Sequence, residues 1–126
     1  PADQRSSVEI EMELEAEVER YNAAFQQLFA ITFQKIGDHT FDFVDRVTRH
    51  VSPERQPYLS GISMVNEGRV DYDQLFNNCV ASASSDPAAI ARAVLSELLT
   101  GWRVEIRAEF KGALDAEVAR VVREVK

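Results

Sequence analysis

The chain has 126 residues, of which 45% are hydrophobic and 28% are charged, so it is long enough to bury one hydrophobic core without disulfides or a structural metal. Its formal net charge of -7 repels phosphate backbones and anionic lipid headgroups, which argues against nucleic acid and membrane surfaces as partners. The single cysteine excludes an internal disulfide, and no apolar run approaches the roughly 20 residues that span a bilayer, so we expect a cytoplasmic location.

Ser7 to Ile36 is predicted to form one long helix. Glutamate and apolar residues alternate over its first part, as in a strand, but glutamate is unfavourable in strands and favourable in helices. An apolar stripe in steps of three and four then continues through the segment, which favours the helix. The stripe consists of Ile10, Leu14, Val18, Tyr21, Phe25 and Leu28. Residues 1–6 are expected to be a flexible lead-in, and Gly37 is expected to end the helix with a positive φ.

Three shorter helices are expected in the middle of the chain. Residues Asp38 to Thr40 can cap a helix that ends before Ser52-Pro53, because the residue before a proline disfavours helical backbone. A bent connector then leads to a third helix over about Tyr58 to Asn66. Asp71 and Gln74 have the spacing of a capping box and predict the start of a fourth helix. Its buried edge is expected to contain Leu75, Phe76, Cys79 and Val80.

The terminal segment, residues 86–126, is predicted to be helical throughout most of its length. Small residues at 81–85 close the preceding helix, and Asp86-Pro87 then supplies an N-cap acceptor and a proline at the first helical position. Gly112 is expected to divide the segment, with Asp115 capping the final helix, although one uninterrupted helix is the alternative. The apolar pattern continues to the end without a stop signal, which suggests a domain excised from a longer multidomain protein.

These elements predict an all-α fold. Short connections favour antiparallel neighbours, so we expect an irregular antiparallel bundle of five or six helices with long first and last helices. No repeat divides the chain, and residues 1–126 are predicted to form a single helical domain.

The sequence contains no catalytic constellation, so we expect no enzyme activity. His39 and His50 would lie about 16 Å apart along one helix and could not share an ion. No Glu-x-x-His, His-Glu-x-x-His or cysteine pair occurs, so neither a metal nor a cofactor is expected. Cys79 lies within an apolar helical pattern, which is typical of a packing residue rather than of a thiolate nucleophile.

Two features indicate alternative classes of protein. His50 lies near the end of a predicted helix and resembles the exposed phosphoacceptor of histidine-phosphotransfer domains. Val51 follows it, however, where the dimerisation domains of histidine kinases have an acidic residue. Alternatively, Phe29, Phe76 and Trp102 can line the pocket of a helical sensor for a small apolar ligand, globin-like but without haem, since no histidine follows His50.

Charge and apolar patterning favour a third interpretation, a non-enzymatic dimerisation or signal-relay module of a cytoplasmic regulatory protein. The acidic start of the first helix and a basic row near the chain end are expected to attract each other, within one chain or across a dimer. Large apolar side chains exposed on a projecting helix would drive self-association, at roughly 1.5 to 3 kcal/mol each. We therefore expect a homodimer, joined to flanking domains of its parent protein. The expected contact residues are Ile10, Leu14, Val18 and Tyr21, with Arg103, Arg107 and Lys111 as orienting charges.

Overall fold

A computed structural model describes residues 7–82 and 86–125, and this part of the chain is helical and contains no strand. The all-α class and the long first helix are thus confirmed, whereas the expected long last helix is wrong, because Gly112 leaves a final helix of 11 residues. The expected lead-in 1–6 lies outside the described residues. No helix in the described part is both long and apolar enough to cross a membrane. The α-helices are α1 (Ser7–Ile36), α2 (Thr40–Thr48), α3 (Tyr72–Ala81), α4 (Pro87–Phe110) and α5 (Asp115–Val125), and the 3-10 helices are η1 (Gly37–His39) and η2 (Gln56–Leu59).

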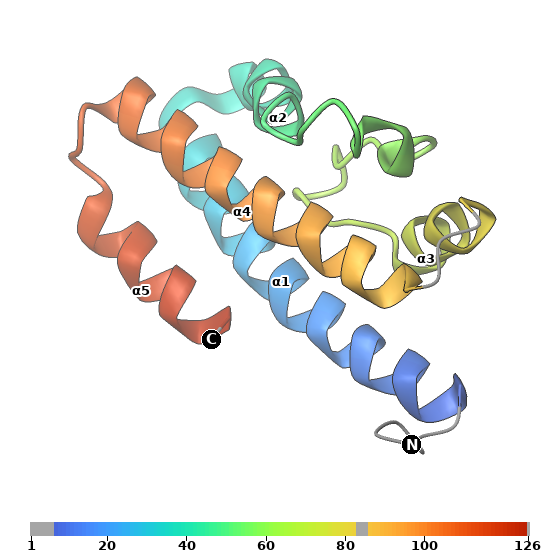
Figure 1. Cartoon of the computed structure of the whole chain (residues 1–126). Coiled ribbons are helices and arrows are strands. Elements are labelled where there is room, and N and C mark those ends of the chain that lie inside the picture. Colours follow the sequence, from blue (N-terminus) through green and yellow to red (C-terminus); the bar gives the residue numbers. More distant parts are fainter. Residues whose placement is uncertain (1–6, 83–85, 126) are drawn as a thin grey trace.

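Helices α1 and α4 lie side by side and run in the same direction (Figure 1). Glu17 of α1 forms an ion pair of 2.8 Å with Arg92 near the start of α4. Helix α5 turns back, so that Glu124 near its end accepts a hydrogen bond from Gln27 of α1. The expected antiparallel packing therefore holds for α5, but α1 and α4 are parallel because residues 37–86 return the chain to the end at which α1 begins. Helices α2 and α3 pack against α4.

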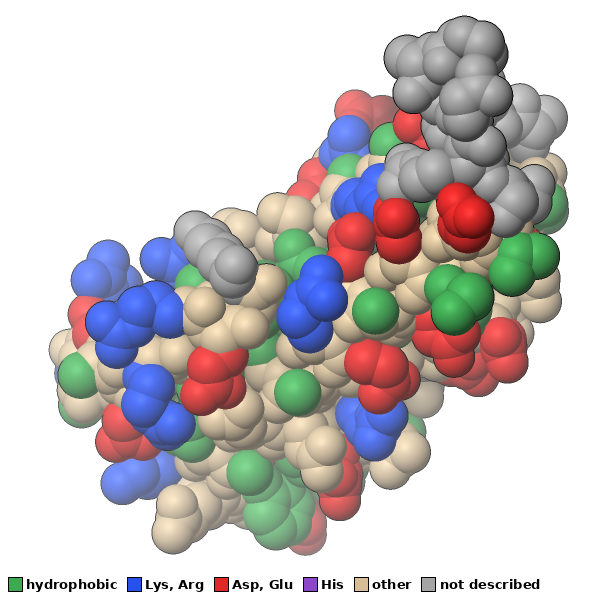
Figure 2. Space-filling model, turned by 90° about the horizontal axis from the view of Figure 1, so that it is seen from below, with side chains coloured by type: hydrophobic (Ala, Val, Ile, Leu, Met, Phe, Trp, Pro, Cys, Tyr) green, Lys and Arg blue, Asp and Glu red, His purple; other side chains and the backbone are tan. Residues whose placement is uncertain are grey.

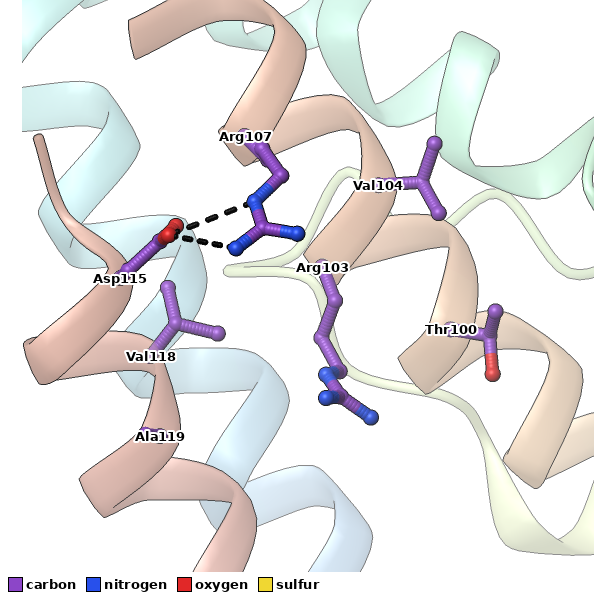
Figure 3. Close-up of a pocket in the computed structure, with 7 residues that line it drawn as sticks. All are labelled: Thr100, Arg103, Val104, Arg107, Asp115, Val118 and Ala119. Atoms are coloured by element: carbon purple, nitrogen blue, oxygen red, sulfur yellow. Dashed lines mark hydrogen bonds and ion pairs between the residues drawn. The ribbon is translucent and has the colours of Figure 1, made fainter. Parts of the chain in front are cut away.

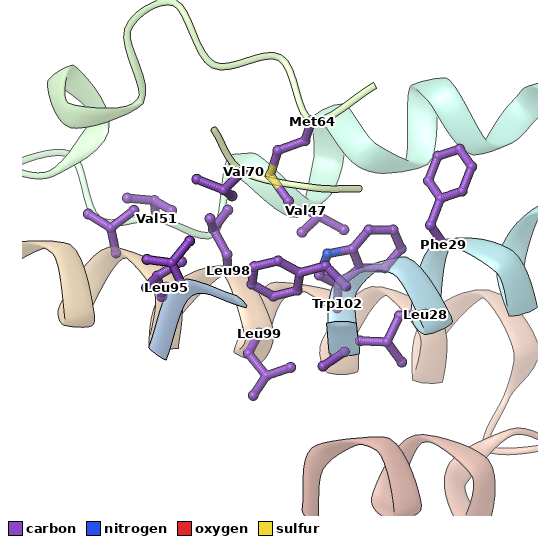
Figure 4. Close-up of a cluster of buried hydrophobic side chains, with 14 of the residues drawn as sticks. Leu28, Phe29, Val47, Val51, Met64, Val70, Leu95, Leu98, Leu99 and Trp102 are labelled. Carbon is purple, nitrogen blue, oxygen red and sulfur yellow. The ribbon is translucent and has the colours of Figure 1, made fainter. Parts of the chain in front are cut away.

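The core is centred on Trp102 of α4 (Figure 4). Its side chain is fully buried, and its ring centroid lies 5.6 Å from that of Phe43 in α2. Gly68 packs against the same indole with a φ of 76°, a backbone conformation that other residues rarely adopt, and with little space for a side chain. A Cβ atom there would lie 3.1 Å from Trp102 Cζ2 and 3.1 Å from the Phe25 carbonyl oxygen. The loop before α3 can therefore cross the core closely only with glycine at this position.

Local signals in the sequence are confirmed at several helix ends. Gly37 follows α1 with a φ of 57°, and Gly112 divides α4 from α5 with a φ of 83°. Asp71 caps α3 and Asp86 caps α4, since each carboxylate accepts the backbone N–H three residues later. The residues expected to close α3 are described only in part, because 83–85 lie outside the described residues.

Three other local predictions are wrong. Residues Asp38 to Thr40 make no side-chain cap and instead form η1 and the first turn of α2. The helix expected over Tyr58 to Asn66 is replaced by η2 and a series of turns, in which Gly61 and Met64 adopt positive φ angles of 79° and 55°. Asp115 is the first residue of α5, and its carboxylate accepts from Arg107 rather than capping the helix.

Candidate interaction surface

Helix α1 buries the stripe that the sequence suggested as a contact surface. Leu14 and Val18 are 0% exposed, and Ile10 and Tyr21 are partly buried at the edge of the same core. Burial, with a smaller contribution from the neighbouring Glu17, raises the pKa of the Tyr21 hydroxyl. Because the chain itself encloses Leu14 and Val18, these two residues cannot contact a second copy while the protein is folded. Their expected role is therefore corrected to that of core residues.

The opposite face of α1 carries a second stripe with the same spacing. Its first five members each precede a position of the buried stripe by two residues, which places them about 200° away around the helix. All its members are exposed, and their steps alternate between four and three, the spacing of helices that pack along a seam. Met12 is 64% exposed and Phe33 43% exposed. This outer stripe consists of Met12, Ala16, Glu19, Ala23, Gln26, Ala30 and Phe33.

The loop between η2 and α3 holds the polar members of the outer stripe. Glu19 Oε2 lies 3.7 Å from Arg69 Nη2, and Gln26 Nε2 donates a hydrogen bond to Glu67 Oε2. The loop itself is attached to α1 by Asn22, whose side-chain amide exchanges two hydrogen bonds with the backbone of Val70. The two polar side chains therefore lie along the helix surface with partners in their own chain.

An open groove of about 570 Å³ lies at the second half of the outer stripe. Phe29 is nearly buried at its base and stacks on Phe33, with 5.9 Å between the ring centroids. Phe41 of α2 lies beside Phe29 and is 41% exposed. The predicted pocket residue Phe29 thus lines a mainly apolar surface groove. The groove is lined by Gln26, Phe29, Ala30, Phe33, Gln34 and Glu67.

Of the three aromatic residues predicted to line one pocket, Phe29 and Trp102 lie near each other beside Gly68, whereas Phe76 lies apart from them. Trp102 is in the core, and Phe76 of α3 stacks on Tyr72 with 5.7 Å between ring centroids. The Tyr72 hydroxyl donates to the Glu11 carbonyl oxygen, which places this pair near the start of α1, whereas Phe29 lies near its end. The arrangement does not bring the three together around one cavity.

Two of the three predicted basic residues line a groove between α4 and α5 (Figure 3). Arg107 Nη2 lies 2.8 Å from Asp115 Oδ2, and this hydrogen-bonded ion pair raises the pKa of the guanidinium. The Arg103 side chain makes no hydrogen bond or ion pair with any residue that the structure describes. Lys111 lies beyond the end of α4 with a φ of 53°, so the basic row along the helix ends at Arg107.

Parallel packing separates these basic residues from the acidic start of α1. Arg103 is eleven residues beyond Arg92, the partner of Glu17, which corresponds to about 16 Å along α4. That distance is about twice the Debye length of about 8 Å at physiological ionic strength. Seen from below, acidic side chains gather where α1 begins, and basic side chains gather on the side of α5 (Figure 2). The expected attraction within one chain is therefore largely screened.

His50 belongs to a polar cluster that joins α2 to α4. Its Nε2 atom lies 2.8 Å from Glu105 Oε2, and Arg46 Nε donates to Glu105 Oε1 at 3.0 Å. Burial raises the pKa of Glu105, but hydrogen bonds from His50 and Arg46 outweigh this effect and lower it. A carboxylate beside Nε2 would repel a phosphoryl group on that atom, so this geometry favours a structural role for His50 over phosphotransfer.

Cys79 lies in the core, as its sequence context predicts. Its side chain is fully buried, and burial raises the pKa of the thiol to about 11. The thiol is therefore protonated and enclosed at neutral pH, which is unfavourable for a nucleophile. Among residues 7–82 and 86–125, no group of three or more His, Cys, Asp or Glu side chains is placed to hold a metal ion.

No protein-family model matches this chain, and no curated protein or solved structure shows significant similarity to it. The outer stripe of α1 is therefore judged on its geometry.

Sequence reasoning missed the outer stripe because three of its seven members are alanines, which carry a weak hydrophobic signal. The alternating steps of four and three were the signal that could have found it.

Proposed function

We propose that this chain is a non-enzymatic helical dimerisation module, and that the outer stripe of α1 is its contact surface. The observation that carries the proposal is the uninterrupted exposed seam from Met12 to Phe33, which extends over roughly 32 Å of helix. A seam of this spacing suits a second helix, because small residues allow close approach and larger ones fill the ends. Complete burial of a large apolar side chain contributes roughly 1.5 to 3 kcal/mol, and Met12 and Phe33, which are 64% and 43% exposed, would each contribute a part of that.

In a longer protein, such a dimer would serve as a signal relay. Domains joined to α1 and α5 would pull on two helices that pack against each other, and a small change in their packing would alter the contact between the two copies. In this proposal, charge orients the two copies, because the acidic start of α1 is attracted to basic residues of the other copy.

The mass of the protein in solution tests this function. Sedimentation equilibrium at tens of micromolar should give the mass of two chains for the wild type and of one chain for Ala23→Glu, which places a charge in the middle of the seam. Ser96→Glu is the matched control, because Ser96 is exposed on α4 away from the outer stripe. This control should remain dimeric, and all three proteins should keep the same helical circular dichroism. A monomeric wild type would refute the proposal.

A further inference from the structure

We infer that two copies pair with their α1 helices antiparallel, about a two-fold axis beside Ala23, and that Met12 of each copy enters the groove at Phe33 of the other. This inference rests on the proposed self-association and adds its direction and register. Three independent features of the outer stripe support it, namely the order of its side chains, the groove and the distribution of charge.

The side chains of the outer stripe follow the same order from either end. From Met12 or from Phe33, the order is large, small, polar, small, polar, small, large. A contact about a two-fold axis needs a surface that complements itself, and this order satisfies that requirement when the helices run antiparallel. Ala23 then lies at the axis, where the helices approach most closely. The matched positions are Met12 with Phe33, Ala16 with Ala30, and Glu19 with Gln26.

The groove at Phe33 offers a place for Met12. The Met12 side chain is largely exposed in its own chain, and its copy of the groove lies about 32 Å away along α1. A second chain in the antiparallel register brings Met12 to the groove lined by Phe29 and Phe33. The thioether adapts to irregular apolar spaces and makes favourable contacts with aromatic rings, so it fits this groove better than a branched side chain would.

Charge opposes the parallel arrangement. Parallel helices would place the acidic start of α1 against itself and Glu19 against Glu19, and like charges in contact are unfavourable. In the antiparallel arrangement, each acidic start moves to the other half of the partner's α1, where Lys35 and the exposed Arg120 and Arg123 of α5 lie. Helix α5 covers only the second half of α1, so the first half leaves room for the partner's α5 (Figure 1).

Disulfide trapping can test direction and self-association separately. Three single-cysteine variants are made in a Cys79→Ala background: Ala23→Cys, Met12→Cys and Phe33→Cys. Ala23→Cys lies at the axis and should form a disulfide dimer under mild oxidation. Met12→Cys and Phe33→Cys should each form few disulfide dimers alone. When the two variants are mixed, the cysteine at position 12 of one copy should form a disulfide with the cysteine at position 33 of the other. The second contact of this mixed dimer remains the native one between Met12 and Phe33. Ser96→Cys, on the outward face of α4, is the control for random collision.

A mixed disulfide at least about tenfold above the Ser96→Cys background supports the antiparallel register. Efficient self-crosslinking of Met12→Cys and of Phe33→Cys would overturn it in favour of parallel helices, while Ala23→Cys dimers would still support self-association. If Ala23→Cys gives only the background level and the wild type is a monomer by mass, both the register and the proposed function are refuted. Unchanged circular dichroism of each variant shows that it is folded.

Discussion

The inner and outer faces of α1 share one spacing and differ in the size of their side chains. The inner face carries Leu14, Val18, Phe25 and Leu28, all fully buried against the rest of the chain. The outer face has alanine at three of its seven positions and large apolar groups only at its ends. Large side chains fill the space among several packed elements, whereas small ones suit the close approach of a single helix. Spacing thus identifies which residues share a face, and side-chain size indicates which face forms the core.

The largest expected change in unfolding free energy distinguishes the inner face of α1 from its outer face. Leu14→Ala should lower the free energy of unfolding by about 2 to 5 kcal/mol, because it leaves a cavity in the core. Met12→Ala, two residues away on the outer face, should change it by no more than about 0.5 kcal/mol at concentrations where the protein is monomeric. Urea denaturation at sub-micromolar protein measures both values. Equal losses in the two variants would contradict the division of α1 into a core face and a free face.

The contact between α2 and α4 provides an internal example of close helix approach. A Cβ atom on Gly101 would lie 2.7 Å from the Val47 carbonyl oxygen, so Gly101→Ala must push the two helices apart. We expect a loss of about 1 to 3 kcal/mol in unfolding free energy, although alanine favours the helix. Thermal unfolding followed by circular dichroism measures this, and a variant more stable than the wild type would contradict the packing described for α2.

Enlarging the middle of the outer stripe should affect association without affecting folding. Ala23→Leu adds apolar surface, yet at the axis the added atoms would hold the helices apart, at a cost of about 1 to 3 kcal/mol. The dimer dissociation constant should therefore rise by about 5-fold to 150-fold, while the unfolding free energy of the monomer stays the same. Titration by sedimentation velocity gives the constant. Tighter association of Ala23→Leu would show that the helices do not approach closely at this residue.

The smallest expected loss of stability comes from the polar cluster of Arg46, His50 and Glu105 between α2 and α4, where hydrogen bonding contributes more than packing. Glu105→Gln should cost about 1 kcal/mol at neutral pH, because it removes the charge that accepts from His50 and Arg46. The folded pKa of Glu105 is lowered, so its stabilisation is present above its unfolded pKa of about 4.3 and is lost as the pH falls through the folded value.

Stability curves of the wild type and of Glu105→Gln against pH test this expectation. The two curves should be separated at pH 7 and converge below about pH 4. A separation that persists or grows in acid would show that the carboxylate charge is not the source of the effect.

Local chemistry allowed much of the fold to be predicted from the sequence. The bounds of α1, the caps at Asp71 and Asp86 and the division at Gly112 each depend on a few neighbouring residues. The stretch between η2 and α3 could not be predicted in this way, because its path depends on contacts distant in the sequence. Asn22 binds the backbone of Val70 across 48 residues, and such a contact leaves no local signal.

The candidate site was predicted only in part. The preference for a helical contact surface on α1 came from its apolar spacing, but two faces of the helix share that spacing, and the face with the larger side chains is buried in the core. Periodicity alone does not distinguish a core face from a contact face. The hypothesis therefore named Leu14 and Val18 where the exposed members of the same helix are Met12 and Ala16.

One distance tests the central claim, that the outer face of α1 pairs with a second copy in an antiparallel register. Val8 is exposed and lies one step of four before Met12, so a spin label on Val8→Cys in the Cys79→Ala background marks the start of α1. Pulsed electron paramagnetic resonance at tens of micromolar should give a label separation of about 45 Å between the copies, from the rise of 1.5 Å per residue and the spacing of packed helices. A separation below about 20 Å would indicate parallel helices, and the absence of any dipolar signal would indicate a monomer; either result would contradict this account.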